Sequence, residues 1–425
     1  MLLESSPEET NAPAWVRRLP RVFRHRNYRL FYLGQGAALI GAWIQTVALS
    51  WLVYRLTHSV FLLGLVTFVA QAPIFFIAPF GGTIADRYDR RSVFIVTRAL
   101  CMVQAAILTA LTVSNWIGIG SIILLALILG IITAVETPVR QSFTVDMVGR
   151  DDLRQAIAFN AMLFNLARTI GPAIGGIIVA TLGEGLCFLL NTLSYAAVLA
   201  SLFSMKTKSK IARSDTHPWD DLKEGFYYVV RHPHLRMVLF LSAVCSCFGT
   251  SYLALMPAFA QDILHEGADG LGYLISAFGV GAIAGAVMVS RLPERRLAIT
   301  PTITAVVLGL SLVAFANTRS VWLALLLVVP TGIGYLGIAV SSNTQVQTLS
   351  DDAMLGRMMS FYSMGALGTP PFGALLLGYI SDLIGVRGAF MLSGGVCLIA
   401  AGLSLMSLRR RGLLEVDVLS EAPKS

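Results

Sequence analysis

Charged residues are scarce in this chain of 425 residues, because only 13% are Asp, Glu, Lys or Arg, whereas 56% are hydrophobic. Ordinary soluble domains carry roughly 45 to 50% apolar and about 25% charged residues. A water-exposed surface cannot be built from so few charges. The mean hydropathy of +0.72 comes from repeated long apolar runs rather than from one anchor. The sequence therefore predicts a protein that is embedded in a bilayer along most of its length.

The sequence also lacks the residue sets of enzymes and metalloproteins. It contains no Walker loop and no paired intramembrane histidines, and its six histidines lie in polar segments or at the ends of apolar runs. The cysteines lie inside apolar runs, where they behave as small buried hydrophobic residues. We therefore expect no enzyme activity, no catalytic residue, no cofactor and no metal site. The cysteines are Cys101, Cys187, Cys245, Cys247 and Cys397.

Twelve segments are long and apolar enough to cross a hydrocarbon core of about 30 Å, which takes about 20 helical residues. Six precede a long polar interruption and six follow it. The first six are approximately Leu30–Tyr54, Val60–Ala85, Val93–Val113, Trp116–Thr137, Ala156–Leu182 and Leu186–Phe203. The second six are approximately Met237–Phe259, Leu271–Ser290, Leu297–Ala316, Val321–Val340, Met358–Ile380 and Val386–Leu408.

Lys and Arg residues indicate the orientation, because they accumulate in loops that stay in the cytoplasm. With the N-terminus inside, 27 of the 32 fall in tails and inner loops, so both termini are predicted to be cytoplasmic. The net charge of +8 follows from this topology and does not favour a nucleic-acid partner. The predicted organisation is a basic N-terminal tail (1–29), a six-helix bundle (30–205), a linker with an interfacial helix (206–236), a second six-helix bundle (237–408) and a C-terminal tail (409–425).

The two halves repeat each other. Arg91 after the second span corresponds to Arg296 after the eighth, and Pro172 corresponds to Pro370, at offsets of roughly 200 residues. Such duplication about an axis along the membrane normal is typical of alternating-access carriers, which bind substrate between the halves. We therefore expect an all-α membrane protein with twelve transmembrane helices in two pseudo-symmetric six-helix bundles.

The loop after the second span reads Gly82-Thr83-Ile84-Ala85-Asp86-Arg87-Tyr88-Asp89-Arg90-Arg91. It resembles the signature of the major facilitator superfamily, Gly-x-x-x-Asp-Arg-x-Gly-Arg-Arg, with Asp89 in place of a glycine. The resemblance implies a latch between the halves, in which Asp86 faces the N-terminus of the eleventh helix and Arg90 or Arg91 holds an acid on the fourth. A solvated basic loop is the alternative. The residues assigned to this gating latch are Gly82, Asp86, Arg87, Arg90 and Arg91.

The fifth span carries Gly171, Pro172, Gly175 and Gly176. Small residues let helices approach closely, and proline frees a backbone carbonyl and allows bending. The spacing resembles the antiporter motif Gly-Pro-x-x-Gly-Gly, which the superfamily associates with export, although simple packing would also account for it. With the stretch from Glu136 to Phe143, the sequence is similar to the branch that contains enterobactin exporters and macrolide efflux proteins.

Three ionisable residues lie within spans of the first half, where each costs about 2.5 to 3.5 kcal/mol or more. Glu136 lies near the end of the fourth span, within reach of Arg90, Arg91 or Arg98. A structural ion pair is the first interpretation of Glu136, and a proton-coupling or substrate-cation role is the alternative. Arg168 lies deeper, as a structural counter-ion or as a contact to an anionic substrate, and both interpretations stay open.

In the resembling fold the first, fourth, seventh and tenth helices line the cavity, which implies candidate substrate contacts on these spans. Gln45 and Tyr252 are preferred, because uncharged hydrogen-bonding groups in an apolar cavity suit an amphipathic ligand. Hydrogen bonding between helices is the alternative role for each. The weaker candidates are Gln35, Asn343, Trp43 and Tyr335.

The sequence thus predicts a secondary active transporter in a bacterial cytoplasmic membrane that exports a small amphipathic molecule, such as a siderophore or a drug, by proton antiport. Its expected partners are the small-molecule substrate, protons and the lipid bilayer, and we expect a monomer. Uptake or facilitated diffusion of a nutrient is an alternative within transport. A non-transporting membrane sensor is an alternative of another class, although the chain has no sizeable soluble module.

Overall fold

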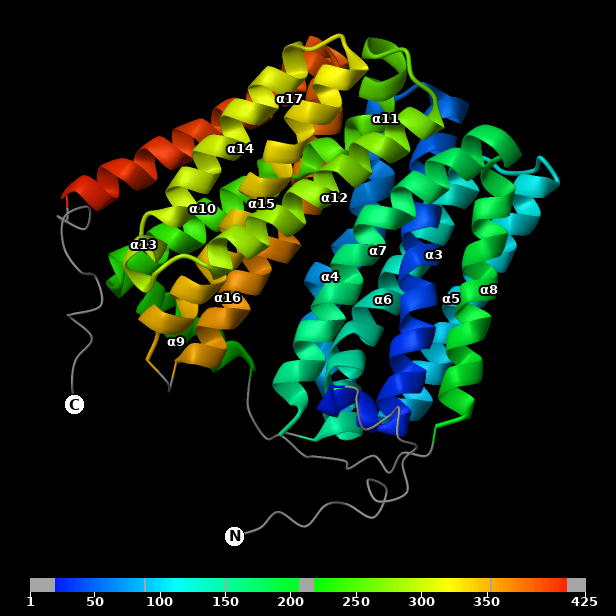
Figure 1. The fold of residues 1–425 in the computed structure, drawn as a ribbon, viewed down its shortest axis with the longest axis horizontal. Helices are drawn as coiled ribbons and strands as arrows, with labels where there is room; N and C mark the ends of the chain where they lie inside the picture. The colour runs from blue at the N-terminus through cyan, green and yellow to red at the C-terminus, as the bar shows by residue number, and fades with distance from the viewer. Residues whose placement is uncertain (1–19, 88, 150, 206–217, 352–353, 411–425) are drawn as a thin grey trace.

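The computed structural model describes residues 20–87, 89–149, 151–205, 218–351 and 354–410, and this part of the chain is helical without a strand (Figure 1). Long helices are expected in lipid, because every backbone N–H and C=O must be bonded within its own segment. The first half follows the order of the six predicted spans. Its elements are η1 (Arg21–Arg24), α3 (Arg26–Thr57), α4 (Val60–Arg87), α5 (Arg90–Val113), α6 (Ile119–Val148), α7 (Leu153–Leu182) and α8 (Glu184–Phe203).

The second half contains more breaks than the sequence predicted. A single helix was expected from Met237 to Phe259, but α10 stops at Gly249. There the hydroxyl of Ser251 donates to the carbonyls of Cys247 and Pro370. The elements are α9 (Pro218–Arg231), α10 (Pro233–Gly249), η2 (Ser251–Leu255), α11 (Met256–Ala258), η3 (Phe259–Ile263), α12 (Ala268–Ser290), α13 (Glu294–Leu297), α14 (Thr300–Asn317), α15 (Val321–Leu349), α16 (Leu355–Gly368) and α17 (Pro370–Arg410).

The helices accommodate the twelve predicted spans. Among the described residues, ten helical segments are long and apolar enough to cross a membrane, judged by length and composition. One of them, Leu355–Arg410, contains two predicted spans that meet at Gly385, where φ is 76° and the helix geometry is interrupted. A shorter apolar stretch of α4, Val60–Phe76, supplies the remaining span.

The fourth span is longer than predicted. It was expected to end at Thr137, but α6 continues through Pro138 to Val148. The extension is stable because Val139, Phe143 and Met147, each four residues apart, are buried in the core of the first half. A fourth span that ends at Thr137 would leave Asp146 in a loop and Glu136 near the end of its helix. In the structure Asp146 lies in α6, and Glu136 lies in the middle of that helix.

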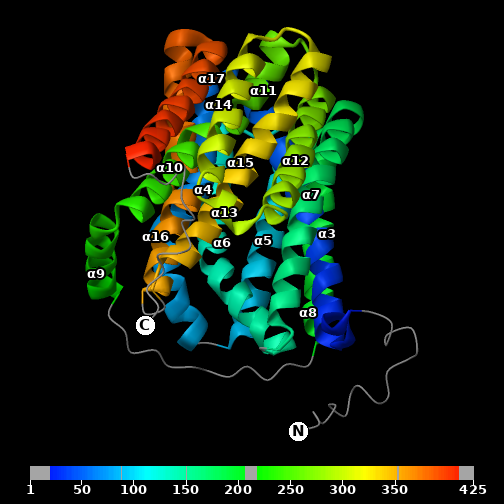
Figure 2. The same ribbon diagram turned by 60° about the vertical axis from the view of Figure 1, so that its left-hand side comes forward.

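The two halves exchange equivalent contacts. Helix α7 packs against α12, and α17 packs against α4 (Figures 1 and 2). A Cβ atom on Gly176 would lie 2.5 Å from the carbonyl oxygen of Ala268, and one on Gly64 would lie 2.4 Å from that of Ala374. Such glycines let the two backbones approach closely. In both contacts the fifth span of one half meets the second span of the other, as pseudo-two-fold symmetry requires.

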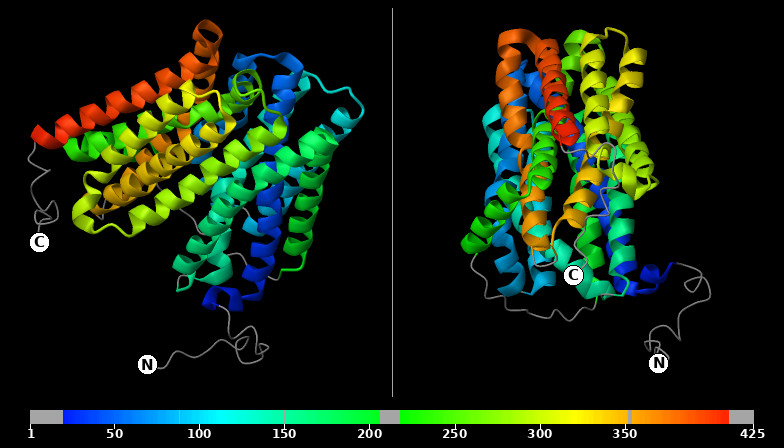
Figure 3. Two further views of the ribbon diagram at one scale, coloured as in Figure 1. Left: turned by 45° about the horizontal axis from the view of Figure 1, so that its top comes forward. Right: turned by 90° about the vertical axis from the view of Figure 1, so that its left-hand side faces the viewer.

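The halves pack together at one end and diverge at the other (Figure 3). We call the end at which α3 begins and α8 ends the linker end, because the linker to α9 leaves from it. The core at the opposite end is shared, since it includes Leu52 of the first half and Tyr252 of the second. Near the linker end the cores are separate: Phe94 and Phe143 belong to a cluster of the first half, and Met358 to one of the second.

The linker helix α9 is attached to the second half, beside α10 and α16 (Figure 2). The guanidinium of Arg357 lies 3.0 Å from the carboxylate of Glu224, and the hydroxyl of Tyr228 donates to Asp351 at 3.0 Å. Phe226 is exposed. The helix was predicted, and its position on the membrane surface stays a prediction.

Candidate transport site

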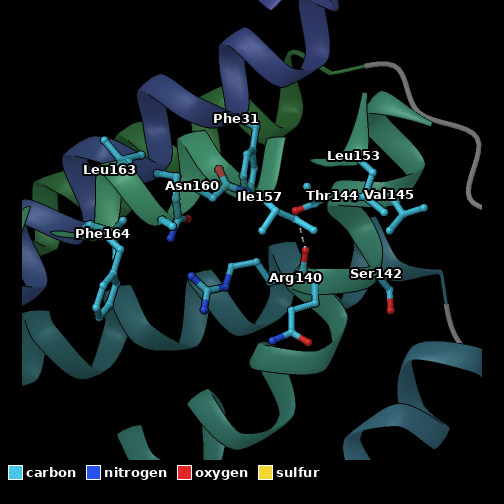
Figure 4. A pocket seen from close by; sticks show the side chains of 14 residues that line it. Phe31, Arg140, Ser142, Thr144, Val145, Leu153, Ile157, Asn160, Leu163 and Phe164 are labelled. Atoms are coloured by element: carbon cyan, nitrogen blue, oxygen red, sulfur yellow. Dashed lines mark hydrogen bonds between the residues drawn. The ribbon is translucent and has the colours of Figure 1, made fainter. Parts of the chain in front are cut away.

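A cavity of about 600 Å³ lies between α3, α6 and α7 of the first half, nearer the linker end (Figure 4). Its walls combine apolar side chains with a few polar ones, a mixture that suits a small amphipathic molecule. The polar lining residues include Gln35, Arg140, Gln141, Thr144 and Asn160. The apolar lining residues include Phe31, Leu39, Ile157, Leu163 and Phe164.

A buried ion pair lies beside this cavity. The guanidinium of Arg98 on α5 donates to the carboxylate of Glu136 on α6 at 2.6 Å and to the side-chain oxygen of Gln35 at 3.3 Å. The side chains of Arg98 and Glu136 are only 8% and 7% exposed. Arg140, one turn further along α6, places its Nε 4.0 Å from the same carboxylate oxygen. Of the arginines considered from the sequence, Arg98 is the one that the structure brings to Glu136.

Arg168 lies on α7, where the two halves meet. Its side chain donates to Asn165 at 3.0 Å, and its guanidinium lies over the ring of Phe278 on α12, 5.7 Å from the ring centre. The residue is only 7% exposed, and its Nε has no hydrogen-bond partner. Among the described residues, no carboxylate lies within 4.0 Å of it. A buried charge without a counter-charge is unfavourable, so this arginine needs a further explanation.

The glycines of the predicted antiporter motif pack α7 between two helices. A Cβ atom on Gly171 would lie 2.6 Å from the side chain of Trp43, and one on Gly175 would lie 3.1 Å from the backbone of Ile44, both on α3. Gly176 faces the other way, against α12. The carbonyl of Pro172 lies at the same contact, 2.5 Å from where a Cβ on Gly272 would stand. The motif therefore places α7 against its own half and against the other half at once.

The predicted latch is described only in part. The side chains of residues 77–87 lie outside the described part, so Gly82, Asp86 and Arg87 are placed only as the last turns of α4. Arg90 donates to the carboxylate of Asp146 on α6 at 3.0 and 3.1 Å. Arg91 donates to the carbonyl of Leu202 on α8 at 2.9 Å. These two arginines hold the start of α5 within the first half.

Of the six candidate substrate contacts named from the sequence, only Gln35 lines the cavity. Gln45 accepts a hydrogen bond of 2.7 Å from Asn191 on α8, and its side chain is buried. Tyr252 is fully buried and shares a hydrogen bond of 2.7 Å with Thr331.

Asn343 on α15, another of these candidates, accepts a hydrogen bond of 2.6 Å from Gln347 one turn further along the same helix. In this conformation Gln45, Tyr252 and Asn343 thus serve contacts within or between helices.

Sequence reasoning missed most of the cavity residues, among them Arg140, Asn160 and Phe164. Arg140 was counted in a loop because α6 was expected to end too early. On α7, Ile157, Asn160 and Phe164 recur at intervals of three and four, the spacing of one helix face. That spacing could have identified the cavity wall once α7 was recognised as a cavity helix.

Two groups of membrane-spanning helices in reciprocal contact, with a polar and apolar cavity among the helices of the first group, define a polytopic transporter of the duplicated type. A family model described as "Transmembrane secretion effector" matches residues 21–423. The chain therefore belongs to this family, which is part of the major facilitator superfamily, and it is a transporter rather than an enzyme.

Two curated relatives are similar over most of their length. The staphyloferrin A transporter of Staphylococcus aureus is 26% identical over 370 residues, which cover 86% of this chain and 92% of the relative. An enterobactin exporter of Shigella boydii is 25% identical over 401 residues, which cover 94% of this chain and 95% of the relative.

Solved structures share the fold at low sequence identity. A bacterial homologue of the human lysosomal transporter Spinster, in an inward-facing and unoccupied conformation, has a TM-score of 0.66 at 13% identity, with 95% of this chain and 98% of that chain covered. The peptide transporter POT has a TM-score of 0.72 at 14% identity, with 91% and 94% covered. These similarities support the all-α fold of the superfamily.

Proposed function

We propose that this protein is a secondary active exporter that moves a small amphipathic molecule, such as a siderophore, out of a bacterial cell by alternating access. The supporting observation is that the cavity lies toward the linker end, where the halves diverge, while the opposite end has a shared core. If the linker end and both termini face the cytoplasm, as Lys and Arg predict, this conformation can load substrate from inside. Both relatives carry the name of a siderophore in their own names.

Alternation would be achieved by rocking of the halves about their two glycine-lined contacts, α7 with α12 and α4 with α17. Gly176 and Gly64 provide backbone surfaces without side chains that would block such a motion. Closure of the linker end would bring Asp86 at the end of α4 to the positively polarised N-terminus of α16, which is the proposed latch. The protein would work as a monomer, because one chain contains both halves that rock against each other.

Proton coupling is assigned to Glu136. It is the acid that the described spans bury beside the cavity, and it touches both the buried Arg98 and the cavity residue Arg140. Protonation of Glu136 would weaken its hold on both guanidiniums and so connect a proton to the substrate path.

The test is transport by purified protein in proteoliposomes, with enterobactin, staphyloferrin A and a cationic macrolide as probes. We expect one siderophore to accumulate against its gradient when protons flow the opposite way, and accumulation to stop when an ionophore collapses the gradient. The Glu136→Gln protein should keep exchange of substrate across the membrane but lose proton-driven accumulation. Accumulation that does not depend on the proton gradient would contradict antiport. Exchange of substrate without proton-driven accumulation by the unchanged protein would also contradict antiport and would favour facilitated diffusion.

A further inference from the structure

Positive charge exceeds negative charge around the cavity. Arg98, Arg140 and Arg168 lie on α5, α6 and α7, whereas Glu136 is the one carboxylate within 4.0 Å of any of them among the described residues. The carboxylate of Glu136 accepts a hydrogen bond of 2.6 Å from Arg98 and lies 4.0 Å from the Nε of Arg140. Arg98 and Arg140 therefore share the single carboxylate of Glu136, and Arg168 has no carboxylate within 4.0 Å among the described residues.

Arg140 presents its charge to the cavity. Its side chain is 33% exposed, in contrast to the buried Arg98. Figure 4 shows its guanidinium extending toward the side of the cavity on which Asn160 and Phe164 lie. A guanidinium in this position can donate to an anionic group of a ligand without leaving its helix.

Arg168 lies one turn deeper on the same face of α7. Asn160 and Phe164 line the cavity, and Arg168 follows Phe164 by four residues, which is about 5.4 Å further along the helix. Its Nε is buried and has no hydrogen-bond partner, although a guanidinium in an apolar interior normally has all its donors satisfied. The unsatisfied donor points to a ligand group that completes the site.

An apolar side chain lies on α7 between the cavity residue Asn160 and Arg168. Phe164, which stacks edge-on against Trp43 at 6.1 Å, lies between the positions of Asn160 and Arg168 on α7. Phe31 and Leu163 extend the apolar wall of the cavity. A ligand that meets both arginines must therefore carry its acidic groups on an apolar body.

We infer that the transported molecule is an organic anion with an apolar body and two acidic oxygen groups, and that these groups are bound by Arg140 in the cavity wall and by Arg168, one turn beyond the lining residue Phe164. This inference rests on the proposed transport function, and it names the substrate class and the residues that select it. Cations are rejected by the same two guanidiniums.

The test measures binding to the full-length protein in lipid nanodiscs by isothermal titration calorimetry. The probes are a naphthalene dicarboxylate, the corresponding monocarboxylate, the neutral dimethyl ester and a naphthyl ammonium cation. We expect the dicarboxylate to bind at least about tenfold more tightly than the monocarboxylate, a difference of about 1.4 kcal/mol, and the ester and the cation to bind more weakly still. Equal binding of the ester or the cation and the dicarboxylate would overturn the inference.

Variants assign the site. Arg168→Gln and Arg140→Gln should each reduce dicarboxylate affinity by about tenfold and leave ester binding unchanged, so that the dicarboxylate binds like the monocarboxylate. The control is Arg55→Gln. Arg55 does not line the cavity, and its side chain pairs with the carboxylate of Glu184 at 2.8 Å. If Arg168→Gln behaves like this control, Arg168 is not a ligand-binding residue.

Two further measurements distinguish failure of the anion site from failure of the transport proposal. Arg168→Lys retains the charge and should bind the dicarboxylate with an intermediate affinity, and it replaces Arg168→Gln if that protein does not fold. If the unchanged protein binds the dicarboxylate as expected but does not exchange any probe across proteoliposomes, the transport proposal fails and the anion site stands. If it transports only cationic or neutral probes, the anion site fails and transport stands.

Discussion

The contact between Gly176 and α12 offers a direct way to shift the conformation of this transporter. A Cβ atom at Gly176 would lie 2.5 Å from the carbonyl oxygen of Ala268, 3.0 Å from the Cα of Gly272 and 3.1 Å from the Cα of Asp269. All three are backbone atoms, so no side-chain rotation can relieve the clash. We predict that Gly176→Ala disfavours the conformation in which the opposite end is closed.

The size of the effect follows from the cost of overpacking. Forcing extra carbon into a closely packed contact costs about 1 to 3 kcal/mol. Gly176 lies near the end of α7 at the opposite end, so this part of the contact separates when that end opens while the halves still pivot on the rest of it. The penalty therefore falls on the closed state, and the open fraction should rise about fivefold to about 150-fold.

The assay is alkylation of a single cysteine by a maleimide that cannot cross the membrane. Leu271→Cys, in a background without the five native cysteines, places this cysteine in the fully buried core at the opposite end. We expect Gly176→Ala to raise the alkylation rate by the factor above. The matched control is Gly402→Ala, since a Cβ at Gly402 meets nothing within 4 Å. The reasoning is refuted if the two alanine variants react at the same rate while both remain folded.

Two other changes test local contacts. Glu136→Gln should lower the thermal unfolding temperature, because the buried guanidinium of Arg98 loses its counter-charge. Removing one partner of a buried ion pair costs about 3 to 5 kcal/mol. An unchanged melting curve at low and high salt would show that the pair is not structural. Tyr228→Phe should speed limited proteolysis of the linker while cleavage elsewhere stays constant. The reason is that burial raises the pKa of the Tyr228 phenol, so the hydroxyl stays protonated and donates to Asp351. This hydrogen bond is worth about 0.5 to 1.5 kcal/mol. Equal cleavage rates would rule out a role of this hydrogen bond in holding α9.

The spans and their duplication could be predicted because lipid imposes a simple rule, namely about 20 apolar residues for each crossing. The rule fails where protein rather than lipid surrounds the helix. The extension of α6 past Thr137 is polar on one face and is stabilised by Val139 and Phe143 on the other, so hydropathy alone underestimates it. The break after Gly249 precedes Pro257, whose missing N–H interrupts a helix and is visible in the sequence, whereas the hydrogen bond from Ser251 to the carbonyl of Pro370 is not.

The types of residue at the site could be predicted from the sequence, but their positions and partners could not. Intramembrane charges are rare, so Glu136 and Arg168 stood out from the sequence. Which arginine would meet Glu136 depended on the packing of α5 against α6, and only the structure brings Arg98 to it. Gln45 was favoured because an uncharged amide suits an amphipathic ligand, yet Asn191 on a helix far along the chain takes up that amide. Rules about residue type do not say which partner a buried polar group will find.

The central claim, that two halves rock about their glycine-lined contacts, is tested most directly by two distances measured by pulsed electron spin resonance in the same protein. One spin-label pair, at Arg154 on α7 and Ser360 on α16, reports on the linker end, and the other, at Leu182 and Arg319, reports on the opposite end. When a proton gradient and a transported probe drive turnover, we predict that the linker-end distance shortens in the same population in which the opposite-end distance lengthens. If both distances shorten or lengthen together, or if neither changes during measured transport, rocking about these contacts is contradicted.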